Sequence, residues 1–370
     1  MILDDLDAFE TRAELADMLK TLFDKVSPHE ELDARAVRAA SGEYDRPLWD
    51  RLNQEVGVIT LTVPEELGGS GATVAETAVV LELIGRRAAG IPFLGAFLTT
   101  EALVRSGASA ALDRWLEPLM SGATIGAVAW GGSLTAARSA SGWAIGGEVT
   151  PVIDGYHADL LVVPASAADG ERWFAVDLTG RCNRRRVETL DLTRDVTALD
   201  LFDAPAVPLT EPGDGALGRV LHDLATLALA VEQLGVAEQA VADAVEYAKL
   251  REQFGRTIGS FQALKHRLVD MLVATELAEA AVLDVADADR FDDADLAERA
   301  ASARVLAGRA AMFAAEEAIQ IHGGIGFTWE HPLHHHFRRA KTDQLLFQDH
   351  AVHVDTVAHA MLGRARATSV

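Results

Sequence analysis

Two loops in the second half of the chain contain residue types suited to binding a phosphorylated ligand with an aromatic part. The first, residues 251–259, reads Arg-Glu-Gln-Phe-Gly-Arg-Thr-Ile-Gly. An arginine guanidinium offers forked donors and a fixed charge to a phosphate, and glycine frees nearby backbone amides. Phe254 lies beside them and is suited to stacking on a flat base. The alternative is an ordinary turn between two helices, with glycine following the first helix.

A second loop is richer in glycine. Residues 320–327 read Gln-Ile-His-Gly-Gly-Ile-Gly-Phe. Glycines so closely spaced allow another backbone or a ligand to approach the chain. Taken alone, the loop is also explained by a helix that ends in glycine. The presence of both loops in one chain favours ligand binding.

The surrounding sequence predicts an α+β fold in three parts. Residues 1–122 form a predicted N-terminal helical domain, because apolar residues recur at steps near 3.6. Residues 123–214 form a predicted small β domain, since short alternating or β-branched runs are separated by turn residues. Residues 215–370 form a predicted C-terminal four-helix bundle. Its helical segments are residues 218–252, 260–288, 295–322 and 332–362.

Composition narrows the class of protein. Of 370 residues, 33 are Lys or Arg and 56 are Asp or Glu, giving a net charge of −23 that argues against a nucleic-acid partner. The single cysteine, Cys182, fits a reducing compartment. The first residues are acidic and lack the basic-then-apolar order of a signal peptide. No apolar run reaches about 18 residues, so we expect a cytoplasmic protein without a membrane span.

The two loops and the order of the three parts resemble those of the acyl-CoA dehydrogenases. These flavoproteins remove a proton and a hydride from the α and β carbons of acyl-CoA thioesters. The run REQFGRTIGSFQ, which ends at Gln262, is similar to the family's R-x-x-F-G…Q loop, and QIHGGIGFTW to its Q-x-x-G-G-x-G loop. Residues 61–71, LTVPEELGGSG, resemble its PEEYGG turn. The segment FTWEHPLHHHFRRAK resembles the actinobacterial branch that includes steroid side-chain dehydrogenases, where homotetramers and mixed α₂β₂ assemblies both occur.

The resemblance implies FAD as cofactor and a site built from two subunits. Arg251 would meet the pyrophosphate of a neighbouring subunit's FAD, with Gln253 and Phe254 beside its adenosine part. Gln262 would contact the cofactor from the next helix. The adenine end would be covered by three residues of the second loop: Gln320, Gly323 and Gly324. Oligomerisation would therefore be required for cofactor binding.

The usual catalytic base is missing. The family's reaction needs a carboxylate within reach of the α-proton, and the two usual glutamate positions hold Phe347 and Ala225. Asp349 lies two residues past the first position and is the candidate base, although it is equally suited to capping a helix. Glu232 is a weaker candidate, about two turns beyond Ala225 on the same helix face. Asp223 falls where the family often has an acidic residue near the substrate.

The β domain departs from the family as well. At the place of the family's T-E-P stretch, residues 127–133 read Ala-Val-Ala-Trp-Gly-Gly-Ser. The strand that backs the flavin ring, W-[IST]-T in the family, is Pro-Val-Ile at residues 151–153. Apolar groups thus replace hydroxyls at both points, which predicts a weak hold on the flavin.

Three consecutive histidines, residues 334–336, are not predicted to bind a metal. Consecutive residues on a helix point in different directions, so they rarely share one ion.

Three functions remain open, and the first is the leading hypothesis. The first is FAD-dependent α,β-dehydrogenation of an acyl-CoA, with a bulky or steroid-derived acyl group, by a subunit of an oligomer that passes electrons to an acceptor such as an electron-transferring flavoprotein. The second is a non-catalytic partner subunit that completes the FAD site of a homologous catalytic subunit in a heterotetramer. The third is a flavin-dependent oxidase or hydroxylase on the same scaffold. The missing bases and the altered strands favour the partner subunit. The two loops are required both by a catalytic subunit and by a partner subunit, so they do not distinguish these two functions.

Overall fold

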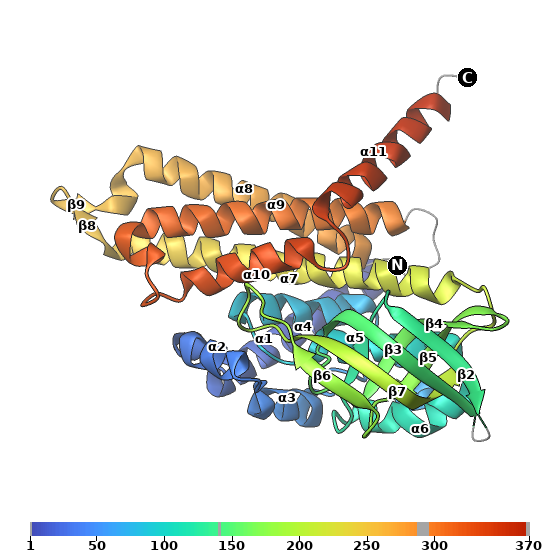
Figure 1. Ribbon diagram of the computed structural model, residues 1–370. Helices are drawn as coiled ribbons and strands as arrows, with labels where there is room; N and C mark the ends of the chain where they lie inside the picture. Colours follow the sequence, from blue (N-terminus) through green and yellow to red (C-terminus); the bar gives the residue numbers. More distant parts are fainter. Residues whose placement is uncertain (1, 140–141, 287–295, 368–370) are drawn as a thin grey trace.

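The computed structural model describes residues 2–139, 142–286 and 296–367. Figure 1 shows a long helical bundle that lies over a small β domain and a group of shorter helices. Helices come first, strands follow and the bundle ends the chain. The predicted α+β fold class is confirmed.

The first part contains short and medium helices. They are α1 (Ile2–Val26), η1 (His29–Glu31), α2 (Leu32–Ala40), α3 (Arg46–Arg51), η2 (Leu52–Val56), η3 (Glu65–Leu67), α4 (Val74–Arg87), α5 (Phe93–Ser106) and α6 (Ser109–Met120). Helix α4 begins at a capping box, in which the Thr73 hydroxyl accepts from the helix backbone and Glu76 accepts from the Thr73 backbone N–H at 2.8 Å. Local sequence therefore determines where α4 starts.

The second part is a β domain. Its strands are β1 (Gly126–Val128), β2 (Ser133–Ser139), β3 (Gly142–Ile153), β4 (Leu160–Ala167), β5 (Gly170–Asp177), β6 (Cys182–Arg186) and β7 (Val196–Pro208). The order β1-β4-β2-β3-β7-β5, with an additional β4–β5 pairing, closes the sheet on itself, and β6 pairs with β7. Alternate residues of β4 and β5, such as Leu161, Val163 and Phe174, fill its separate apolar core.

The third part is the helical bundle. It consists of α7 (Ala216–Leu250), β8 (Glu252–Gln253), β9 (Arg256–Thr257), η4 (Ile258–Ser260), α8 (Gln262–Ala286), α9 (Leu296–His322), η5 (Gly323–Phe327), α10 (Leu333–Leu345) and α11 (His350–Ala367). The last predicted helical segment, residues 332–362, is two helices instead of one. Phe347 adopts φ 64°, a left-handed conformation that a continuous helix does not allow.

Helix α7 is the central element of the bundle. It meets α4 at two glycines: a Cβ on Gly85 would lie 2.0 Å from the Glu232 carbonyl, and one on Gly235 would lie 2.0 Å from the Glu82 carbonyl. Among the described residues, α7 is the one helix long and apolar enough to cross a membrane by length and composition, but 83% of its most apolar window is buried inside the protein. That burial is expected of a core helix.

Candidate functional site

The first predicted loop forms a tight hairpin at one end of the bundle (Figure 1). Phe254 and Gly255, which connect β8 to β9, have φ 55° and 74°, the pair of positive values that a type I′ turn requires. The turn holds the Phe254 side chain 92% exposed. Arg251 is also exposed, and its guanidinium makes no hydrogen bond or ion pair with any residue that the structure describes. The hairpin thus presents a free cation and an aromatic ring to solvent.

The second predicted loop lies against the base of this hairpin. Tyr247, in the last turn of α7, stacks on His322, the last residue of α9, with ring centroids 4.1 Å apart. His322 is buried, and burial lowers its pKa, so the ring is neutral near pH 7. The stack fixes the two helix ends relative to each other. The two predicted loops therefore share one end of the bundle.

The remaining predicted cofactor residues all face solvent. Gln320 and Gln262 are exposed, and a Cβ placed on Gly323 or Gly324 would meet nothing within 4 Å. The Gln253 amide donates to the Glu252 carbonyl at 2.8 Å. A dinucleotide needs donors to its phosphates and a surface for its base. The arginine, the side-chain amides and the open glycine backbone supply donors, and the phenyl ring supplies a stacking surface. These residues fit the adenosine diphosphate part of FAD.

The β8–β9 hairpin lies away from the β domain of its own chain. In Figure 1 the β8–β9 hairpin is at the far end of the bundle from strands β2, β3 and β4. Arg251 directly precedes β8, so it belongs to this same end of the bundle.

On the β-domain side, aromatic rings gather around Phe347, the position where the family resemblance expects the base. Phe347, between α10 and α11, lies edge-on to the Trp130 indole with ring centroids 4.7 Å apart. Trp173 and His222 also lie around Trp130, each with centroids 6.4 Å from it. The indole N–H of Trp130 donates to the Gly218 carbonyl at 3.4 Å. Sequence reasoning missed this cluster, because its members come from separate parts of the chain.

The predicted flavin-backing segment, residues 151–153, is apolar, and its last two residues are packed inward. Val152 and Ile153 are buried at the end of β3, and Pro151 has no backbone N–H to donate. This chain therefore offers a flavin few donors at the point where the family resemblance places its ring.

Asp349 caps the start of the last helix. Its carboxylate accepts from the Ala351 backbone N–H at 3.0 Å, in the first turn of α11. The side chain is exposed in a groove of about 480 Å³ that Arg309 and Lys341 also line. Asp349 remains the candidate base by position, but the structure gives it a capping role.

Glu232 is held in a buried ion-pair network. Its carboxylate accepts from Arg194 and, at 3.1 Å, from Arg339. Arg194 also contacts Asp343 at 2.9 Å, and Arg339 contacts Asp191 at 2.5 Å. These five residues join α7 and α10 to the segment before β7. Two arginines inside the protein therefore occupy the Glu232 carboxylate.

Asp223 lies in the first turns of α7, beside the aromatic cluster. It is half-buried, and its carboxylate is 3.7 Å from the Nδ1 atom of His222. The other ring nitrogen of His222 is buried without a hydrogen-bond partner among the described residues. His222 therefore belongs to this region, although no sequence motif singled it out.

Two family models match most of the chain. The model "Acyl-CoA dehydrogenase, N-terminal domain" matches residues 10–123, and "Acyl-CoA dehydrogenase, C-terminal domain" matches residues 223–362. The second match includes both solvent-facing loops.

Two curated relatives are similar over most of their length. Acyl-CoA dehydrogenase IpdE2 of Mycobacterium tuberculosis is 38% identical over 307 residues, which cover 83% of this chain and 84% of the relative. Acyl-CoA dehydrogenase FadE27 of the same organism is 31% identical and covers 91% of this chain and 93% of its own.

Solved structures share the fold. One, described as "Tcur3481-Tcur3483 steroid ACAD G363A variant", has a TM-score of 0.83 and 26% identity, covering 97% of this chain and 99% of its own. Another, the ChsE4-ChsE5 complex from Mycobacterium tuberculosis, has a TM-score of 0.83 and 28% identity, covering 95% and 97%. Each is named for two components.

Proposed function

This chain belongs to the acyl-CoA dehydrogenase family, and from that premise we propose that it takes part in FAD-dependent α,β-dehydrogenation of an acyl-CoA thioester as a subunit of an oligomer. The family's enzymes are oxidoreductases acting on a CH–CH bond. FAD, when bound, supplies the hydride acceptor.

The role best supported for this chain is that of the partner subunit. It would complete the FAD site of a homologous catalytic subunit in a heterotetramer. The observation that carries this proposal is the contact of Phe347 with Trp130, because this apolar ring holds the position where the family resemblance expects the base. A phenyl ring cannot accept a proton.

The exposed hairpin supplies what a neighbour's cofactor needs. Arg251 would neutralise the pyrophosphate, and Phe254 would stack beside the adenosine part. The loop containing Gln320 and Gly324 would cover the adenine. These side chains bind and orient, and none of them moves a proton.

An exposed apolar stripe on α8 supports assembly. Val269, Leu272, Val273 and Leu277 are 46–58% exposed on one side of that helix. Apolar groups gathered on one helix face favour burial against another protein surface. This feature is compatible with both a homotetramer and an α₂β₂ assembly, and it does not distinguish them.

The proposed identities of the acyl group and of the electron acceptor rest on similarity to other proteins. A steroid-derived or otherwise bulky acyl group is suggested by a structural relative described as a steroid ACAD. We propose an electron-transferring flavoprotein as acceptor, because the family resemblance implies a separate protein.

Turnover by defined assemblies tests the proposal. A homologue that co-purifies with the tagged chain would be co-expressed with it, and acyl-CoA oxidation would be measured with an artificial electron acceptor. We expect activity from the mixed assembly, loss of activity when the homologue's glutamate base is changed to glutamine, and no activity from this chain alone. Full activity from this chain alone would contradict the partner-subunit role and leave the family's reaction intact.

A further inference from the structure

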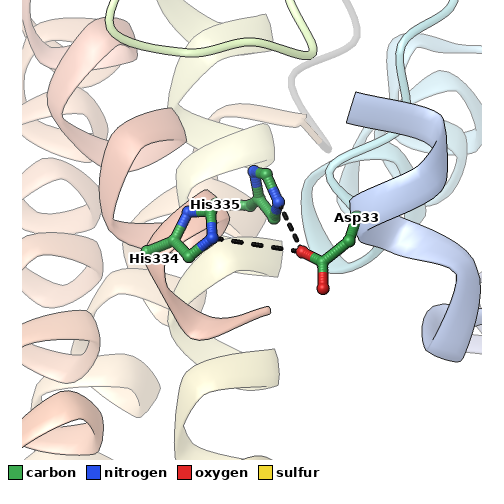
Figure 2. Close-up of side chains that lie close together, drawn as sticks. All are labelled: Asp33, His334 and His335. Atoms are coloured by element: carbon green, nitrogen blue, oxygen red, sulfur yellow. Dashed lines mark hydrogen bonds and ion pairs between the residues drawn. The ribbon is translucent and has the colours of Figure 1, made fainter. Parts of the chain in front are cut away.

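A carboxylate and two histidines meet where the N-terminal helices contact the bundle. Asp33 lies on α2, whereas His334 and His335 lie in the first turn of α10, and Figure 2 shows both rings turned toward the same carboxylate. The Nε2 atom of His335 is 2.7 Å from Asp33 Oδ1, and that of His334 is 4.0 Å from it. The two neighbouring histidines thus share one partner, contrary to the expectation for consecutive helical residues.

Hydrogen bonding leaves this cluster incompletely satisfied. Both ring nitrogens of His334 and the Nδ1 atom of His335 are buried without a hydrogen-bond partner among the described residues. The His335 ring is only 3% exposed. Leaving buried polar nitrogens unpaired costs free energy. A further ligand at this point would remove part of that cost.

The guanidinium of Arg338, which is close to the cluster, makes its contacts with other residues. The Arg338 guanidinium lies 4.4 Å from the centre of the Trp329 ring and donates to the Leu190 carbonyl at 3.2 Å. These contacts hold Arg338 on Trp329, whose ring also packs with its centroid 4.6 Å from that of His334. The carboxylate of Asp33 is the charged group that contacts both imidazoles among the described residues.

We propose that Asp33, His334 and His335 form a binding site for a divalent transition metal, with zinc as the best match. One donor atom from each residue lies within 4.8 Å of the other two. Zinc bonds of about 2.0–2.2 Å place tetrahedral ligands roughly 3.3 Å apart. The His334 nitrogen, 4.0 Å from Asp33 Oδ1, would therefore move closer to that oxygen, and the His335 nitrogen, 2.7 Å from it, would move slightly away. Two imidazoles and one carboxylate favour zinc over magnesium or calcium, which prefer oxygen ligands alone.

The proposed site is open to solvent, and a bound ion would link two parts of the fold. The Asp33 side chain is 47% exposed, which leaves room for ion entry and for water as a fourth ligand. A bound ion would join α2 to the start of α10. It would therefore hold the N-terminal domain against the bundle, close to the loop that ends at Trp329. This role is independent of FAD.

Metal binding to the full chain provides the test. Chelator-treated protein would be titrated with ZnCl₂ by calorimetry, its melting temperature recorded with and without zinc, and its visible spectrum recorded with Co²⁺. We expect one saturable zinc site, a zinc-dependent rise in melting temperature, and Co²⁺ absorption bands typical of four-coordinate geometry.

Matched variants locate the ion. Asp33→Asn keeps the shape of the side chain and its ability to accept from His335, so the fold should persist. We expect Asp33→Asn and His334→Gln each to weaken zinc binding at least about tenfold. His359→Gln, a change at an exposed histidine of α11, should have no effect. Absence of saturable zinc binding, or equal binding by both site variants and the parent chain, would overturn the proposal.

Discussion

The phenyl ring of Phe347 lies edge-on against the indole of Trp130, with their centroids 4.7 Å apart and their planes at 65°. Phe347 occupies a position where the family resemblance places the catalytic glutamate, and Trp130 lies in the segment expected to touch the flavin. The contact closes the junction between the β domain and the loop before α11. The position where the resemblance expects the glutamate is thus filled by a ring that packs on Trp130.

The energetic coupling of this pair is measurable. Phe347→Ala and Trp130→Ala should each lower the free energy of unfolding by about 1–3 kcal/mol, because both rings are half-buried. A double-mutant cycle should give a coupling of about 0.5–1.5 kcal/mol between them. Denaturant unfolding provides the values. A cycle between Trp130 and the exposed Phe254 should give none, and equal results in both cycles would disprove the contact.

Two substitutions separate a catalytic role of Asp349 from its role as a helix cap. Asparagine caps a helix about as well as aspartate but cannot act as a carboxylate base. We expect Asp349→Asn to leave the turnover of the mixed assembly and the melting temperature nearly unchanged. Asp349→Ala should cost about 1 kcal/mol of stability through the lost cap. If Asp349→Asn abolishes turnover while the assembly stays folded, Asp349 is the base and the partner-subunit role is wrong.

Arg251 should act on the cofactor of a neighbour. Arg251→Ala should lower FAD retention in the assembled protein by roughly tenfold, because a charge-assisted contact with the pyrophosphate is lost. Bound flavin per assembly, read from visible absorption after gel filtration, measures the effect. The matched control is Arg185→Ala, at an exposed arginine on β6. Equal flavin retention by the two variants would contradict the placement of Arg251.

The buried carboxylate of Asp154 makes the free energy of unfolding depend on pH. Its carboxylate is buried, and burial raises its pKa from 3.8 to about 7 although the Gly95 N–H stabilises the charged form. The folded state therefore holds this proton more tightly than the unfolded state, so stability from this group falls as pH rises from about 4 to 7.

An asparagine in place of Asp154 would remain neutral throughout that range. We expect Asp154→Asn to gain stability over the parent chain as pH rises, reaching on the order of 4 kcal/mol above pH 7 and vanishing near pH 4. Asparagine also tolerates the left-handed φ of 59° at this position. Unfolding curves at several pH values measure the difference. A constant difference across that range would show that Asp154 does not titrate as described.

Structural features that depend on residues close together in the sequence were predictable from it. The start of α4 follows from the capping box of Thr73 and Glu76, which lie three residues apart. The turn at Phe254 and Gly255 follows from the glycine-containing loop between two periodic segments. The α+β class needed only the change from a period near 3.6 to short strands and back.

Contacts between distant residues were not predictable in the same way. Asp33 and His335 are 302 residues apart in the chain, and no local pattern pairs them. Glu232 looked available on its helix face, because its partners Arg194 and Arg339 come from other elements. The break at Phe347 was missed because apolar and polar residues continue a helical pattern across it, whereas tertiary packing on Trp130 draws that side chain inward.

The visible absorption spectrum of this chain, purified alone and purified with its homologous subunit, tests the central claim most directly. The account predicts flavin bands in the mixed assembly, with bleaching by the acyl-CoA substrate that disappears when the homologue's glutamate is replaced. It predicts that this chain alone shows no flavin that an acyl-CoA can bleach. A full complement of flavin on this chain alone, bleached by an acyl-CoA, would show that it builds a complete active site and would contradict the partner-subunit role.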